Sequence, residues 1–317
     1  MDPQLKQTLE NQQYGIAGNH SAVKICTWTK KSLLDKGFCY KEKFYGIRSH
    51  LCCQMTPSVG HCVNNCVYCW RTVEHSMSND FEPLDQPEVI IKNCVKNQRI
   101  LLSGFGGNKD VNMEKLKEAQ NPEHFAISLS GEPTMYPKLN QLIRLLHNKS
   151  KTTFLVTNGM FPEVIKNLEM PTQLYISLSA PNKELFKKIN QPLLNNGWER
   201  LNKSLDILCD LNGSTRTTLR LTMISNLNMI HPEQWAALIE KASPKFVEVK
   251  AYMFVGSSRQ RRTISDMPYH EDIVEFSKEL EKYGSYKVID QKKESRVVLM
   301  MEQDSRDRIM DFPKRKI

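Results

Sequence analysis

The order of strand-like and helix-like segments constrains the fold of this chain most. Five short runs rich in β-branched and aromatic residues end in Gly, Pro, Asn or Ser: FAISLSGEP, TTFLVTNG, QLYISLSAP, TLRLTMISN and FVEVKAYMFVG. Apolar residues at helical spacing lie between them. This alternation predicts parallel βαβ units. With CCQMTPSVGHC as a first strand there are six, too few for a closed eight-stranded barrel, so we predict an α/β fold with a partial (βα)6 TIM-like barrel.

Two extensions are expected around this barrel. Residues 1–60 lack clear periodicity and predict a loosely structured segment that a metal cluster could hold together in place of an apolar core. The barrel is expected over residues 51–283. Residues 284–317 contain one strand-like pair and a basic tail, and predict a basic C-terminal extension.

Composition indicates which binding partners and which cellular compartment to expect. Lys and Arg number 44 against 35 Asp and Glu, which gives a net charge of +9 and favours a polyanion such as nucleic acid, although a basic protein without such a partner would show the same balance. No apolar run long enough to span a membrane and no signal peptide are found in the sequence. We therefore expect a cytoplasmic protein without a membrane partner. Its nine cysteines are expected to serve metal or redox chemistry rather than disulfides.

Three cysteines follow the first predicted strand, in HCVNNCVYCW. Cys62, Cys66 and Cys69 form a C-x3-C-x2-C pattern. Three thiolates on one short loop can hold three irons of a [4Fe-4S] cluster, which leaves the fourth iron open to another ligand. The alternative is a zinc site completed by His61 or His75, but zinc sites favour paired C-x2-C units. A cluster at the carboxyl ends of the strands is therefore predicted.

The cysteine loop, the SGEP strand end and the six-unit layout resemble the radical S-adenosylmethionine superfamily. The resemblance implies that the open iron chelates the amino and carboxylate groups of S-adenosylmethionine, which the cluster then cleaves to a 5′-deoxyadenosyl radical. Ser130, Gly131 and Glu132 match the family position that binds the cofactor's amino group, with serine in place of the first glycine. Three further residues end strands and could face the same cofactor, with ordinary turns or caps as the alternative: Ser179 at the ribose-contacting position, Asn158 and Asn226.

An earlier triplet, Cys26, Cys39 and Cys52, has C-x12-C-x12-C spacing. Together with the later loop, SGEPTMYP and LVTNG, it is similar to the archaeal tRNA 4-demethylwyosine synthase family. The resemblance covers nearly the whole chain and implies that this triplet binds a second [4Fe-4S] cluster with an open iron. Cys94 and Cys209 lie in helical patterns and are expected to be buried.

The family resemblance also implies a reaction. N1-methylguanosine next to the anticodon of phenylalanine tRNA loses a methyl hydrogen, the carbon radical adds to pyruvate, two pyruvate carbons close a third ring, and the carboxyl carbon is lost. The second cluster could chelate pyruvate, and a lysine with a depressed pKa could hold it as a Schiff base. Lys41 is the first candidate, Lys43 and Lys250 are further ones, and surface lysines are the alternative.

Basic residues are candidates for phosphate contacts: Arg259, Arg261 and Arg262 after the last barrel strand, and Lys314, Arg315 and Lys316 in the tail. Eukaryotic relatives carry an electron-supplying flavodoxin-like domain, whereas this chain begins almost directly with the cluster-binding segment. We therefore expect a separate electron-donor protein and a monomeric enzyme. Two alternatives stay open: a radical enzyme acting on a protein or small molecule, and a zinc-dependent RNA-binding protein without catalysis.

Overall fold

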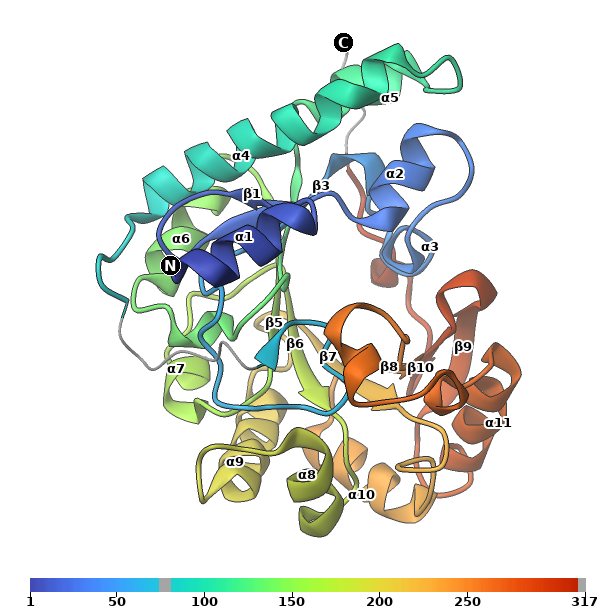
Figure 1. Ribbon diagram of the computed structural model, residues 1–317. Coiled ribbons are helices and arrows are strands. Elements are labelled where there is room, and N and C mark those ends of the chain that lie inside the picture. The colour runs from blue at the N-terminus through green and yellow to red at the C-terminus, as the bar shows by residue number, and fades with distance from the viewer. Residues whose placement is uncertain (74–80, 313–317) are drawn as a thin grey trace.

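The computed structural model describes residues 1–73 and 81–312, and its ten strands form one mixed sheet in the order β1-β2-β3-β4-β5-β6-β7-β8-β10-β9 (Figure 1). The six strands from β3 to β8 pair in parallel with their sequence neighbours. The strands at both ends of the sheet are antiparallel. The α/β class and the six predicted parallel strands are therefore confirmed.

The strands are β1 (Gly15–Ile16), β2 (Ala22–Lys24), β3 (Cys52–Thr56), β4 (His124–Ile127), β5 (Thr152–Thr157), β6 (Gln173–Leu178), β7 (Arg216–Met223), β8 (Phe246–Ala251), β9 (Lys287–Lys292) and β10 (Val297–Met301). The helices are α1 (Pro3–Asn11), α2 (Thr27–Leu33), α3 (Tyr40–Tyr45), α4 (Pro87–Ser103), α5 (Met113–Ala119), α6 (Leu139–His147), α7 (Pro162–Lys166), α8 (Lys183–Asn190), α9 (Gly197–Asp210), α10 (Pro232–Ala242) and α11 (His270–Leu280).

The two faces of the parallel sheet differ in chemistry. One face is apolar and packs under the helices; Leu221 belongs to the main core. On the other face of β7 and β8, the register pairs Arg220 with Glu248 and Thr222 with Lys250. Because side chains alternate along a strand, charged residues at every second position must share one face. Glu248 is fully buried there, so this face encloses a polar interior rather than solvent.

The structure corrects the expectation of a loosely structured amino-terminal segment. Two short helices, α2 and α3, form between Cys26 and Cys52. Their apolar residues pack elsewhere than in the main core: Leu33 and Phe44 lie in separate small clusters. These helices could not be recognised from the sequence, because a helix of one or two turns is too short to show a clear apolar periodicity.

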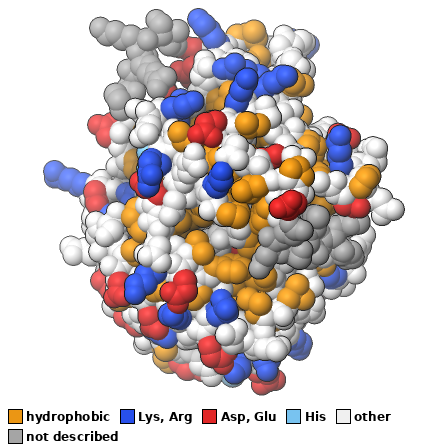
Figure 2. Space-filling model, turned by 90° about the vertical axis from the view of Figure 1, so that its left-hand side faces the viewer, with side chains coloured by type: hydrophobic (Ala, Val, Ile, Leu, Met, Phe, Trp, Pro, Cys, Tyr) orange, Lys and Arg blue, Asp and Glu red, His pale blue; other side chains and the backbone are white. Residues whose placement is uncertain are grey.

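The other end of the chain extends the same sheet. β10 pairs antiparallel with β8, and β9 pairs with β10, which confirms the strand-like pair expected there. None of the helices in the described part of the chain is both long and apolar enough to cross a membrane. Figure 2 views the side that is on the left in Figure 1, and Lys and Arg side chains are denser in its upper part than in its lower part.

Candidate active site

The later cysteine triplet lies on the loop that follows β3. Cys62 is buried, and Cys66 and Cys69 are half-buried. Backbone contacts hold this loop against the end of α8: Val67 N donates to Ile189 O at 2.9 Å, and Asn65 N donates to Gln191 O at 3.2 Å. Burial raises the pKa of Cys66, and the nearby thiols of Cys69 and Cys62 raise it further. The three thiols predicted to act together are therefore neighbours.

Nitrogen donors surround these sulfurs. Asn158 Nδ2 lies 3.7 Å from Cys62 Sγ, and Asn190 Nδ2 lies 3.8 Å from Cys66 Sγ. Arg71 is buried beside the loop; burial alone would lower its pKa, but the three thiols raise it. Donors and positive charge stabilise thiolate sulfur, the form that binds iron. Sequence reasoning named Asn158 for another reason and missed Asn190 and Arg71.

The Ser130–Glu132 turn packs directly against the start of this loop. Glu132 N donates to His61 O at 2.7 Å. Gly131 has φ +72°, and a Cβ there would lie 1.7 Å from Ser58 O, so only glycine fits. The Glu132 carboxylate is fully buried and accepts hydrogen bonds from Thr157 Oγ1 at 2.6 Å and Asn158 N at 2.7 Å. Burial raises the pKa of Glu132, whereas these hydrogen bonds lower it; the effect of burial is the larger.

The remaining strand-end candidates separate into one buried and one exposed residue. Ser179 is buried and donates from Oγ to Asn190 Oδ1 at 2.6 Å, so it supports the donor to Cys66. Asn226 is exposed, with φ +59° on a turn. Asn228, which sequence reasoning missed, is buried and donates to Ser179 O at 2.8 Å and Thr222 O at 2.7 Å.

The three cysteines of the earlier triplet each lie where a helix or strand begins. Cys26 and Cys39 precede α2 and α3 as their N-cap residues, and Cys52 is the first residue of β3. Burial raises the pKa of Cys39 and of Cys52 to about 12 each, and Cys26 contributes to both shifts. All three line one cavity of about 320 Å³, whose other walls include Lys41, Gln54, Trp70, Ser128, Arg220 and Lys250.

Two lysines face this cavity. Lys41 is buried, with Nζ 4.4 Å from the centre of the Tyr175 ring, and burial followed by Arg220 lowers its pKa. Lys250 donates to Ser295 O at 2.8 Å, and burial followed by Arg220 lowers its pKa to about 8. Uncharged amines are the nucleophilic form, so both could attack a carbonyl group.

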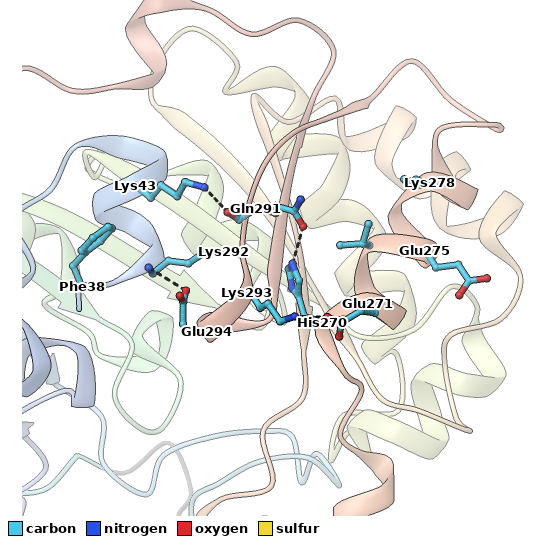
Figure 3. A pocket seen from close by; sticks show the side chains of 11 residues that line it. Phe38, Lys43, His270, Glu271, Glu275, Lys278, Gln291, Lys292, Lys293 and Glu294 are labelled. Atoms are coloured by element: carbon cyan, nitrogen blue, oxygen red, sulfur yellow. Dashed lines mark hydrogen bonds and ion pairs between the residues drawn. The ribbon is translucent and has the colours of Figure 1, made fainter. Parts of the chain in front are cut away.

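Lys43 points elsewhere. It lines a separate hollow of about 730 Å³, in which its Nζ donates to Gln291 O at 2.6 Å (Figure 3). It also lies 2.7 Å from Asp290. Lys43 is exposed and ion-paired, so it lacks the buried, aromatic environment of Lys41.

A buried polar network closes the floor of the cysteine-lined cavity. Glu248 accepts hydrogen bonds from Tyr40 at 2.9 Å, Tyr45 at 2.8 Å and Arg220 Nε at 2.9 Å. Arg220 Nη2 also donates to Tyr40 at 2.8 Å. A buried carboxylate with three donors is fully compensated, so this network fixes the guanidinium of Arg220 beside Lys41.

Each cysteine triplet offers free thiols, the ligand type of iron–sulfur clusters. Within residues 1–73 and 81–312, no three His, Cys, Asp or Glu side chains are grouped so that they could hold one metal ion. A cubane takes one thiolate per iron, so its ligands are spread more widely. His61 is stacked on Phe81, with ring centres 3.8 Å apart, and His75 lies outside the described residues. Asn64, buried in the loop, makes no side-chain hydrogen bond to a described residue, which leaves it available to a bound group.

The arginines proposed for phosphate contacts have different surroundings. Arg261 donates to Cys69 O, and Arg262 forms a two-pronged ion pair with Asp266. Arg259 is exposed, with one bond from Nε to Phe254 O at 3.2 Å. Of the three, Arg259 is the one most available to a phosphate. The tail residues Lys314, Arg315 and Lys316 lie outside the described residues, and Cys209 is exposed, contrary to expectation.

Comparisons with known proteins identify the family of the chain. The sequence pattern of the Radical SAM superfamily matches residues 56–239, and the pattern described as Wyosine base formation matches residues 241–302. S-adenosyl-L-methionine-dependent tRNA 4-demethylwyosine synthase of Pyrococcus horikoshii is 47% identical over 310 residues, which cover 96% of this chain and 90% of that protein. The chain belongs to the tRNA 4-demethylwyosine synthase family.

Solved structures of this family superpose closely on the chain. One, described as TYW1 with a lysine-pyruvate adduct bound, has a TM-score of 0.86 at 38% identity and covers 95% of this chain and 96% of its own. Another, an archaeal TYW1, has a TM-score of 0.80 at 35% identity, with coverage of 98% and 100%. As a member of the 4-demethylwyosine synthase family, the chain is a radical SAM enzyme with the radical SAM α/β fold, S-adenosylmethionine and a [4Fe-4S] cluster as cofactors.

Proposed function

We propose that this enzyme converts N1-methylguanosine next to the anticodon of phenylalanine tRNA, together with pyruvate, into 4-demethylwyosine. The observation that carries the proposal is one cavity in which three thiols, the buried Lys41 and the half-buried Lys250 meet. Such a cavity suits a small keto acid, and the relative with a lysine-pyruvate adduct is 38% identical to this chain. Family membership supports the tRNA substrate.

Two clusters are proposed, one for each triplet. Cys62, Cys66 and Cys69 would hold the cluster that binds S-adenosylmethionine, with Ser130–Glu132, Asn158, Ser179 and Asn226 as the proposed cofactor contacts. Glu132 Oε1 already accepts three hydrogen bonds, but Oε2 accepts one, from Asn158 N, and retains a lone pair for an ammonium group. When bound, these groups supply a 5′-deoxyadenosyl radical. Cys26, Cys39 and Cys52 would hold the second cluster, whose open iron suits the oxygens of a keto acid.

Lys41 is the proposed attachment point for pyruvate. Its amine would attack the keto carbon, and water would leave as the Schiff base forms. Aromatic rings cover it on two sides, because Nζ lies 4.4 Å from the Tyr175 ring centre and 4.8 Å from that of Phe154. These rings shield the amine on two sides. Arg220, held by Glu248, places a fixed positive charge where the pyruvate carboxylate would lie.

The architecture is proposed to divide the work. Residues 51–283 would form a partial (βα)6 barrel around the radical cluster, residues 1–60 would carry the second cluster, and residues 284–317 would add a basic extension. The enzyme is proposed to act as a monomer and to receive electrons from a separate protein.

Trapping with a borohydride reagent tests the attachment point. The anaerobically prepared enzyme is incubated with pyruvate and sodium cyanoborohydride, and the modified peptide is identified by mass spectrometry. Lys41 is expected to carry the reduced adduct, and Lys41→Arg should abolish it. The matched control Lys43→Arg removes a neighbouring surface amine and should leave the adduct in place. An adduct on Lys250, or none on native enzyme, would contradict the assignment.

A further inference from the structure

Trp70 stands between the two cysteine triplets. It follows Cys69 directly in the chain, and its side chain lines the cavity that contains Cys26, Cys52 and Lys41. Its indole is half-buried and lies against Tyr14, with ring centres 6.1 Å apart and planes 21° apart. Trp70 is therefore adjacent in sequence to the later triplet and lines the cavity of the earlier one.

Packing holds the indole, and main-chain contacts hold the backbone of Trp70. Tyr14 is buried among Leu5 and Leu9 of α1, in a small cluster against which Trp70 also packs. In the main chain, Ser257 N donates to Trp70 O at 2.9 Å. Gly256 has φ +57°, and a Cβ there would lie 2.3 Å from the same oxygen. The ring is therefore a preorganised surface rather than a loose side chain.

Uncompensated positive charge lies on the same stack. Lys24 Nζ is 4.6 Å from the centre of the Tyr14 ring and 5.6 Å from that of Trp70. The side chain is half-buried, and no carboxylate in the described ranges forms an ion pair with it. Lys30 is close to the same aromatic pair, because its Nζ donates at 3.2 Å to the neutral amide of Gln13, the residue before Tyr14. Two neighbouring ammonium groups without an acidic partner favour a bound anion.

We propose that Trp70, Tyr14, Lys24 and Lys30 form a nucleotide subsite for the substrate RNA. The N1-methylguanine base stacks on the exposed face of the Trp70 indole, and the adjacent phosphate binds Lys24 and Lys30. Single-stranded RNA is recognised in this way, by bases stacked on aromatic rings and phosphates held by cations. The inference rests on the proposed function and gives the amino-terminal helix α1 a role, because its leucines support the stack.

Salt-dependent binding tests the phosphate contact. The probe is an anticodon stem-loop RNA that contains N1-methylguanosine, and its affinity for the cluster-loaded enzyme is measured by anisotropy over a range of salt. Lys24→Gln is expected to weaken binding about fivefold and to reduce the slope of log K against log salt by about 0.7. Lys24→Arg should retain both the affinity and the slope. The control Lys166→Gln removes an exposed charge on α7 and should change neither. An unchanged slope for Lys24→Gln would overturn the phosphate contact.

A second comparison tests the stack. Trp70→Leu is expected to weaken binding about tenfold, since stacking on an aromatic residue is removed, and Trp70→Phe should recover most of it. With a probe whose modified nucleotide lacks its base, native enzyme and Trp70→Leu should bind equally. If Trp70→Leu weakens both probes alike, or neither, the stacking contact is wrong. Failure of native enzyme to bind either probe would instead refute the proposed function.

Discussion

Asn190 holds its side-chain nitrogen 3.8 Å from the sulfur of Cys66. The same amide accepts a hydrogen bond from Ser179 at 2.6 Å, which fixes the orientation of the side chain. Hydrogen bonds to cluster sulfurs stabilise the added electron and so raise the reduction potential. In this series of contacts, the Ser179 hydroxyl orients the Asn190 amide toward Cys66. The contacts therefore affect how readily the radical cluster is reduced.

Removal of the amide is expected to lower the reduction potential of the radical cluster. One hydrogen bond contributes about 1 kcal/mol, which corresponds to about 40 mV for a one-electron couple. Asn190→Ala should show this shift in a redox titration followed by electron paramagnetic resonance. The titration is performed in Cys26→Ala protein so that the second cluster does not contribute.

Asn167→Ala is the matched control, because the Asn167 side chain, at the C-cap of α7, donates to Glu163 O. The reduction potential of the radical cluster in the Asn167→Ala variant should equal that in the parent protein. If Asn190→Ala and Asn167→Ala give the same potential, Asn190 has no role in tuning the cluster.

Glu248 is expected to be essential for stability. Glu248→Ala removes the carboxylate that pairs with the half-buried Arg220 guanidinium and with two buried tyrosine hydroxyls, and loss of such a partner costs about 3 kcal/mol in the free energy of unfolding. Urea denaturation followed by circular dichroism measures this change. The control Glu163→Ala breaks an exposed ion pair with Lys203 and should leave the midpoint unchanged. Equal midpoints for the two variants would show that the buried network is dispensable.

Asn228 and Asn226 should differ strongly despite their separation by one residue. Asn228→Ala leaves Ser179 O, Thr222 O and Ile224 N without a partner, so we expect a loss of about 3 kcal/mol in the free energy of unfolding. Asn226→Gly should change it by less than about 0.5 kcal/mol, because glycine tolerates the positive φ at an exposed turn. Thermal denaturation distinguishes them, and similar losses would argue against the buried role of Asn228.

Features that form a local pattern along the chain could be predicted from the sequence. The six parallel strands were found because each is a continuous apolar run ended by a turn residue. The spacing of Cys62, Cys66 and Cys69 likewise marks a loop ligand set without reference to the fold. Asn190 carries no such signal, since an asparagine at a helix end is an ordinary cap until the structure shows its distance to Cys66.

Charged residues were the hardest to assign. Arg261 and Arg262 belong to a basic stretch in sequence, yet in the structure one contacts the cysteine loop and the other pairs with Asp266. Glu248 is one acidic residue in an apolar strand, and its partners Tyr40 and Tyr45 lie more than two hundred positions earlier. Contacts of that sequence separation depend on the completed sheet, so no local pattern reports them.

The most direct test of the central claim is the fate of pyruvate carbon. The cluster-loaded enzyme is supplied with a reductant, S-adenosylmethionine, phenylalanine tRNA that contains N1-methylguanosine, and pyruvate labelled at carbons 2 and 3, and the nucleosides are analysed by mass spectrometry. A tricyclic base that carries both labelled carbons is predicted from native enzyme and should be absent with Cys26→Ala. Formation of 5′-deoxyadenosine with unchanged N1-methylguanosine would contradict the account.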